Sequence, residues 1–126
     1  MDWDRMRADV RERAPEEACG LVAGKGNLSC DVISVTNVHH SPARFRMEPE
    51  EQLQAFNHMD EQGWELLAIY HSHPSGPPAP SATDVSEAAY PGVVHLIWST
   101  SGEDWICKGF LIEQSRVEEI PIYVVR

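Results

Sequence analysis

The chain has 126 residues, of which 42% are hydrophobic and 24% charged, so residues 1–126 are predicted to form one domain with its own core. Its 20 acidic residues outnumber its 10 basic ones, and a formal net charge of −10 argues against nucleic acid and anionic membranes as partners. The sequence contains three cysteines, and it shows neither an apolar signal region after Met1 nor an apolar run of membrane length. These features favour the reducing cytoplasm as the expected location of the protein.

Apolar periodicity, with proline and glycine as stop signals, predicts the elements of the first half. In chain order these are a helix over 2–14, a buried strand within 15–24, a strand over 29–37 that completes a hairpin, an extended piece near 45–47, and a helix from Pro49 to Gly63. Proline at the first helical position and acidic residues in the first turn favour the start of that second helix. Its inner face is expected to carry Leu53, Phe56 and Met59.

The second half is predicted to be richer in strands. It contains a central strand over 64–70 that runs into His71, a short helix over 81–89, and strands over 93–99, 105–112 and 117–125. Links of hairpin length outnumber helical crossovers in this pattern. The predicted fold class is therefore an α/β sandwich with a mixed, mostly antiparallel sheet.

A candidate metal site follows the central strand. If His71 and His73 end an extended strand, the period of two places both imidazoles on one face and Ser72 on the other. Catalytic zinc sites use three protein ligands and leave a fourth position to water, and Asp84 is our choice for the third ligand. The alternative is a polar strand end followed by a helix cap, since Ser81 and Asp84 fit a capping pattern.

Amide hydrolysis also needs a group that carries a proton from water to the leaving amine. Glu17, at the edge of the first predicted strand, is the candidate, although sequence proximity alone does not select it over Glu16 or Glu65. The hydroxyl of Ser81 can donate to a developing oxyanion. Cys19 could instead act as a nucleophile, but a small buried residue is the commoner role of such a cysteine.

These residues together resemble the motif of the JAMM (MPN+) metalloproteases, a glutamate followed by His-x-His-x7-Ser-x2-Asp. Glu17, His71, His73, Ser81 and Asp84 match it without a gap, and the likeness to the small stand-alone bacterial members extends over most of the chain. It implies a cytidine-deaminase-like α/β/α sandwich. It also implies one zinc ion on His71, His73 and Asp84, general acid/base catalysis by Glu17, and support of the tetrahedral intermediate by Ser81.

The resemblance further implies a substrate class. Family members cleave peptide or isopeptide bonds after the C-terminal glycines of ubiquitin or ubiquitin-like proteins, and small relatives resemble peptidases that trim sulfur carriers of the ThiS/MoaD type. The chain has no room for the long insertions that recognise ubiquitin chains in eukaryotic relatives. The predicted substrate is therefore the C-terminal tail of a ubiquitin-like or sulfur-carrier protein, for which Phe45 and Met47 either offer a binding edge or simply pack.

Two other functions stay open from the sequence. One is zinc-dependent hydrolysis of a small-molecule amide, and the other is a non-catalytic MPN-type scaffold. Base deamination is disfavoured because the deaminase signature His-x-Glu with Pro-Cys-x-x-Cys is absent. The oligomeric state, a homodimer included, is also left open.

Overall fold

The structure is a computed structural model that describes residues 2–101 and 103–124. Its elements within these residues are α1 (Asp2–Arg13), β1 (Cys19–Lys25), β2 (Leu28–Val35), α2 (Pro49–Gln62), β3 (Glu65–His73), α3 (Ala82–Glu87), β4 (Val94–Ser101), β5 (Asp104–Glu113) and β6 (Arg116–Ile120). They follow the predicted order, and α2 begins at Pro49 and ends before Gly63 as predicted, with Gly63 at a left-handed φ of 72°. The piece predicted near 45–47 contributes only an isolated bridge between Asn37 and Met47.

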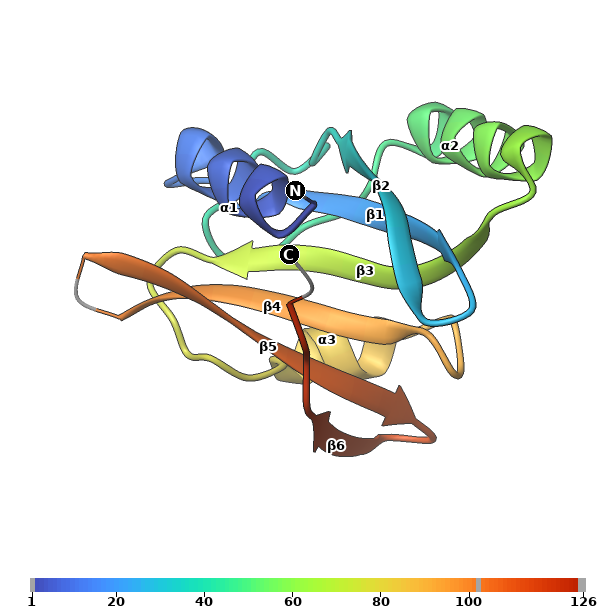
Figure 1. Cartoon of the computed structure of the whole chain (residues 1–126). Coiled ribbons are helices and arrows are strands. Elements are labelled where there is room, and N and C mark those ends of the chain that lie inside the picture. The colour runs from blue at the N-terminus through green and yellow to red at the C-terminus, as the bar shows by residue number, and fades with distance from the viewer. Residues whose placement is uncertain (1, 102, 125–126) are drawn as a thin grey trace.

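The strands form one six-stranded sheet in the order β2-β1-β3-β4-β5-β6 (Figure 1). Strands β3 and β4 run parallel, and every other neighbouring pair is antiparallel. The parallel pair is joined by the crossover that contains α3, because a short turn cannot connect two parallel strands. The predicted mixed, mostly antiparallel sheet is confirmed.

Helices cover both faces of this sheet. Met6 and Val10 of α1 pack on one face with a core cluster that includes Tyr70. Ala55 and Met59 of α2 pack on the opposite face in a second cluster. Because successive strand residues point to opposite faces, Tyr70 and Ser72 lie on the α1 side, whereas His71 and His73 lie on the α2 side. The arrangement is the predicted α/β/α sandwich.

Two predictions about individual residues are wrong. Leu53 does not lie on the inner face of α2, since it is 59% exposed. The buried positions are Ala55 and Met59, and at 3.6 residues per turn Leu53 lies about 140° from their mean direction, nearly on the opposite face of the helix. The last strand ends at Ile120 rather than 125, because Pro121 has no N–H to continue the ladder; residue 125 itself lies outside the described residues.

Strand β3 extends to His73, and its neighbours hold that end in place. In the antiparallel register His71 pairs with Cys19 of β1, and in the parallel register His73 pairs with Ser99 of β4. Both histidines are therefore central in the sheet and not at a free edge. Within the described ranges, no helix has the length and apolar character needed to cross a bilayer.

The close approach of β1 to β3 yields a stability prediction. Gly20 faces Tyr70 across the strands, and a Cβ at Gly20 would overlap the Tyr70 ring, whose hydroxyl donates to Asp9 Oδ2 at 2.6 Å. The substitution Gly20→Ala should therefore lower the free energy of unfolding by about 1–3 kcal/mol in urea denaturation. The control Gly26→Asn, at a φ of 59° with open space around it, should cost less than about 1 kcal/mol. Equal losses in the two variants would contradict the packing argument.

Candidate metal centre

The predicted site residues come from three segments of the chain. His71 and His73 end β3, Asp84 lies in the first turn of α3, and Glu17 lies in the link between α1 and β1. His71, His73 and Glu17 are 1%, 5% and 4% exposed, and the Asp84 side chain is 9% exposed. The fold thus gathers four titratable side chains in one nearly buried place.

Three donor atoms form a nearly equilateral triangle. His71 Nε2 and His73 Nε2 lie 3.1 Å apart, and Asp84 Oδ2 lies 3.1 Å from each of them. In a tetrahedral zinc site with bonds of about 2.0–2.1 Å, neighbouring ligand atoms are about 3.3 Å apart. The triangle therefore has about the size of one face of such a tetrahedron.

Contacts behind the triangle fix the orientation of the two imidazoles. His73 Nδ1 lies 2.9 Å from the Pro77 carbonyl, which can only accept, so Nδ1 carries the hydrogen and neutral His73 keeps its lone pair on Nε2. His71 is stacked on the Phe45 ring, with centroids 4.5 Å apart and planes 25° apart. Burial lowers the pKa of His71, which favours a neutral ring with a free lone pair.

The start of α3 holds Asp84. Ser81 is the N-cap of this helix, and its hydroxyl oxygen accepts from the Asp84 N–H at 3.0 Å, while its own N–H donates to Asp84 Oδ2 at 2.8 Å. The predicted cap and the predicted ligand position therefore coexist in one capping box. Burial alone would raise the pKa of Asp84, but its contacts with the imidazoles of His71 and His73 and with the Ser81 N–H outweigh it and hold that pKa far below its usual range.

Glu17 adds a second carboxyl group beside the histidines. Ligand atoms of Glu17, His71 and His73 all lie within 4.8 Å of one another. Burial raises the pKa of Glu17 to about 7, with a further rise from the charge of Asp84 and an opposing effect of His73. A carboxyl group with a pKa near 7 can both accept and donate a proton at neutral pH.

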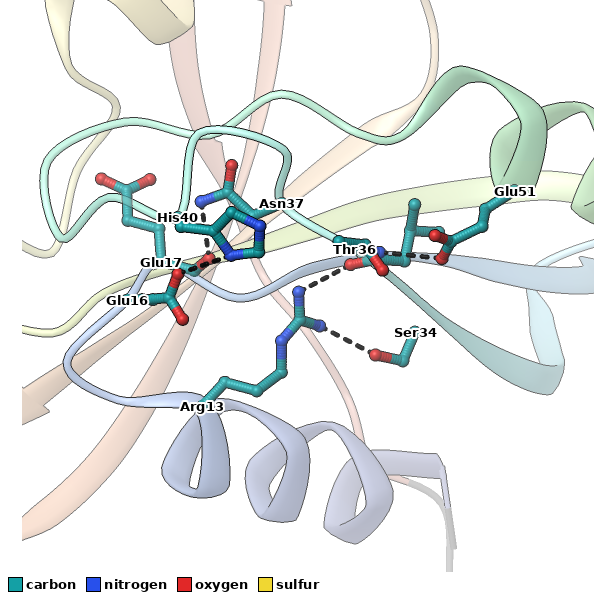
Figure 2. A pocket seen from close by; sticks show the side chains of 9 residues that line it. Arg13, Glu16, Glu17, Ser34, Thr36, Asn37, His40 and Glu51 are labelled. Carbon is teal, nitrogen blue, oxygen red and sulfur yellow. Dashed lines mark hydrogen bonds and ion pairs between the residues drawn. The ribbon is translucent and has the colours of Figure 1, made fainter.

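The structure separates Glu17 from the other two glutamates considered. Glu65 begins β3, at the end of the strand opposite His73. Glu16 and Glu17 both line a cavity of about 230 Å³, where Glu16 contacts His40 Nδ1 at 3.0 Å (Figure 2). Figure 2 shows that the Glu17 carboxyl group points away from Arg13. Of the three candidates, only Glu17 shares a metal-sized cluster with the histidines.

The donor set fits a metal ion. Glu17 Oε1, beside the two histidines, is one of six buried side-chain atoms without a hydrogen-bond partner in the described part of the chain. Unsatisfied buried polar atoms are costly and mark a place where a ligand, ion or water completes the structure. Two imidazole nitrogens with a carboxylate oxygen are donors that zinc accepts. The residues present could therefore hold a metal ion, which bears out the predicted metal centre in general terms.

The sequence did not identify several contacts at this site. The Pro77 carbonyl behind His73 could not be selected among four prolines of the loop, and the role of Phe45 was open between a binding edge and packing. Cys19, considered as a nucleophile, is fully buried, and burial raises its pKa to about 12. Its thiol donates to the Val35 carbonyl at 3.3 Å, so the structural role is the one that the geometry favours.

Several known proteins are similar to this chain in sequence. It is 36% identical over 123 residues, 97% of this chain and 78% of the relative, to a protein named probable TtuB-protein conjugate cleaving protease from Thermus thermophilus. It is 36% identical to a desampylase from Pyrococcus furiosus, with 86% and 76% of the two chains covered. It is 32% identical to a CysO-cysteine peptidase from Mycobacterium tuberculosis, with 95% and 84% covered.

Solved structures agree with the fold. A solution structure of a Desulfitobacterium hafniense protein matches with a TM-score of 0.86 at 37% identity, covering 97% of this chain and 87% of the other. A JAB1/MPN domain protein from Archaeoglobus fulgidus matches with a TM-score of 0.63 at 21% identity, over 99% and 94% of the two chains, which supports the fold alone. The family model described as prokaryotic homologs of the JAB domain matches residues 2–108. The chain belongs to this prokaryotic JAB family, and the predicted resemblance to small JAMM proteins is confirmed.

Proposed function

We propose that the chain is a zinc-dependent peptidase that hydrolyses the bond after the C-terminal glycines of a ubiquitin-like or sulfur-carrier protein. The observation that carries this proposal is the triangle of donor atoms 3.1 Å apart beside the buried Glu17 carboxyl group. The predicted peptidase activity and substrate class are supported by the relatives, which are named as a conjugate-cleaving protease, a desampylase and a CysO-cysteine peptidase.

In this proposal His71, His73 and Asp84 would hold one zinc ion per chain. Such an ion, when bound, polarises a carbonyl oxygen and lowers the pKa of a water molecule from 15.7 to about 7. The residues of the chain prepare the site for it. His73 keeps the Nε2 lone pair available by donating through Nδ1 to Pro77, and the Ser81 N–H orients Asp84 Oδ2.

Glu17 and Ser81 would carry out the remaining steps. As water attacks the scissile carbonyl, Glu17 accepts a proton from it, and then donates that proton to the leaving amine when the C–N bond breaks. The hydroxyl oxygen of Ser81 is held by the Asp84 N–H, so its own hydrogen remains to be donated to the developing oxyanion. Glu17 is the proton carrier because it lies beside the histidines without belonging to the 3.1 Å triangle.

The location and domain organisation also remain proposals. We propose a cytoplasmic protein because all three cysteines are free in the structure. We also propose that residues 1–126 form one domain, since a single sheet connects all six strands.

The substrate and the metal can be tested in one assay. A ThiS/MoaD-type carrier extended by one residue beyond its terminal Gly-Gly should be cleaved after the second glycine, as measured by mass spectrometry of both products. Chelation should lower the rate by roughly 10²-fold or more, and added zinc should restore it, because several kcal/mol of transition-state stabilisation depend on the ion. A protein with one zinc per chain that cleaves neither carriers nor ubiquitin-like tails would contradict the substrate class and favour a small-molecule amide.

The role of Glu17 can be tested against its neighbour. The substitution Glu17→Gln keeps the size of the side chain but removes the proton carrier, so kcat should fall by about 10²–10⁴-fold while the zinc content is unchanged. Glu16→Gln is a matched control, because the Glu16 side chain is 41% exposed, contacts His40 and does not belong to the cluster with the two histidines, and its kcat should stay near the wild-type value. Comparable turnover of the two variants would rule out Glu17 as the acid/base.

Cys19 offers a test of the competing nucleophilic mechanism. Because burial raises its pKa to about 12, the thiol stays protonated and shielded at pH 8. Iodoacetamide should label the exposed Cys30 in the native protein but Cys19 only after unfolding. The Cys19→Ala variant should cost about 1 kcal/mol of stability and keep its turnover per zinc-loaded chain. Loss of turnover with zinc retained would revive the nucleophile.

A further inference from the structure

The peptide group between Glu17 and Ala18 is held at both of its polar ends by side chains from other parts of the fold. The Glu17 carbonyl oxygen accepts from Asn37 Nδ2 at 3.0 Å (Figure 2). The Ala18 N–H donates to Ser72 Oγ at 2.7 Å. Asn37 follows β2 and is 3% exposed, and Ser72 lies in β3 and is 0% exposed. The orientation of this one peptide plane is therefore set by two buried side chains.

This matters because Glu17 has few other restraints. Its Oε1 atom is buried without a hydrogen-bond partner in the described residues, so its carboxyl group is not fixed through that atom. Its backbone N–H donates to the Ser41 carbonyl at 2.8 Å, and the next peptide plane is held as described above. The hydrogen bonds on its backbone therefore set the point from which the buried Glu17 side chain extends toward the histidines.

Ser72 links this backbone directly to the histidines. It stands between His71 and His73, and its side chain points to the opposite face of β3. Besides accepting from the Ala18 N–H, it donates its own N–H to the Ala18 carbonyl at 3.0 Å. Any shift of the β3 end thus moves the histidines and the support of Glu17 together.

Asn37 extends the same arrangement to the loop on the other side. Its Nδ2 also donates to the Arg44 carbonyl at 3.1 Å, and its Oδ1 accepts from the N–H groups of His39 and Arg46, both at 3.1 Å. All four hydrogen-bonding positions of the amide are used, and no other side chain of this size supplies two donors and two acceptors. The loop fixed in this way carries Phe45, which stacks on His71.

We propose that Ser72 and Asn37 are positioning residues that hold the Glu17 carboxyl group at its working distance from the histidine pair. The inference rests on the proposed function of Glu17. Neither residue belongs to the donor triangle, so neither should alter how much zinc is bound. Displacement of a reacting group by about 1 Å can cost 10²-fold in rate, which sets the size of the expected effect.

Ser72→Ala is the first test, with Ser34→Ala as a control that loses a hydroxyl bonded to Asp9 and Arg13 instead. In cleavage of the extended carrier, Ser72→Ala should lower kcat by roughly 10–10²-fold with KM and zinc content near the wild-type values. Ser72→Thr keeps the hydroxyl and should recover most of kcat. A purely structural role would instead lower the melting temperature and leave kcat per zinc-loaded chain unchanged, which would overturn the proposal.

Asn37→Asp is the second variant and covers the case in which Ser72→Ala does not fold. It keeps the acceptor for His39 and Arg46 but cannot donate to the Glu17 carbonyl. A similar loss of kcat is expected. In a Glu17→Gln background either substitution should change the residual rate by less than about twofold, because the group being positioned is already absent. Additive losses would overturn the proposal.

Crystal structures of the wild type and both variants give a readout that needs no activity. A Glu17 carboxyl group displaced by about 1 Å or more in the variants supports the proposal, and an unmoved carboxyl group overturns it. If the wild type cleaves no carrier, the proposed function fails, and this structural comparison still decides whether Ser72 and Asn37 position Glu17.

Discussion

The antiparallel pairing of β1 with β3 is the constraint on which the site depends. Glu17 and His71 are far apart in the sequence, yet the register that pairs Cys19 with His71 brings the start of β1 beside the end of β3. The same register places Gly20 against Tyr70, where only a residue without a Cβ fits. The core packing that fixes the register therefore also fixes the distance between Glu17 and the histidines.

The site gathers polar groups that a stable core would avoid. Two carboxyl groups and two imidazoles are nearly excluded from water, and their burial is unfavourable unless each is paired or bound to a cation. The structure balances part of this cost through the capping box on Asp84, the Pro77 carbonyl behind His73 and the Phe45 ring on His71. Buried atoms that stay without partners, such as Glu17 Oε1, are where an ion or substrate has most to contribute.

Much of this arrangement was predictable because it is local in the sequence. The spacing of His71, His73, Ser81 and Asp84 reflects a strand end, a loop and a first helical turn, each of which has a sequence signal. Glu17 could be chosen only through the family resemblance, because its place depends on strand pairing. The prediction that Leu53 is buried is wrong because periodicity shows that a helix has an apolar stripe more reliably than it shows which face of the helix is buried.

The contacts of Ser72 and Asn37 were beyond sequence reasoning for a related reason. Both act on the backbone of a segment that only the tertiary register brings within hydrogen-bond distance. In helix α3 the dependence is reversed, because here an element of the fold depends on the residues of the site. It has six residues and none of the described ones is buried, and so short a helix is unstable by itself. The Ser81 cap stabilises its first turn, and the contacts of Asp84 with His71 and His73 tie that turn to β3, so interactions that complete the candidate metal centre also hold α3 against the sheet.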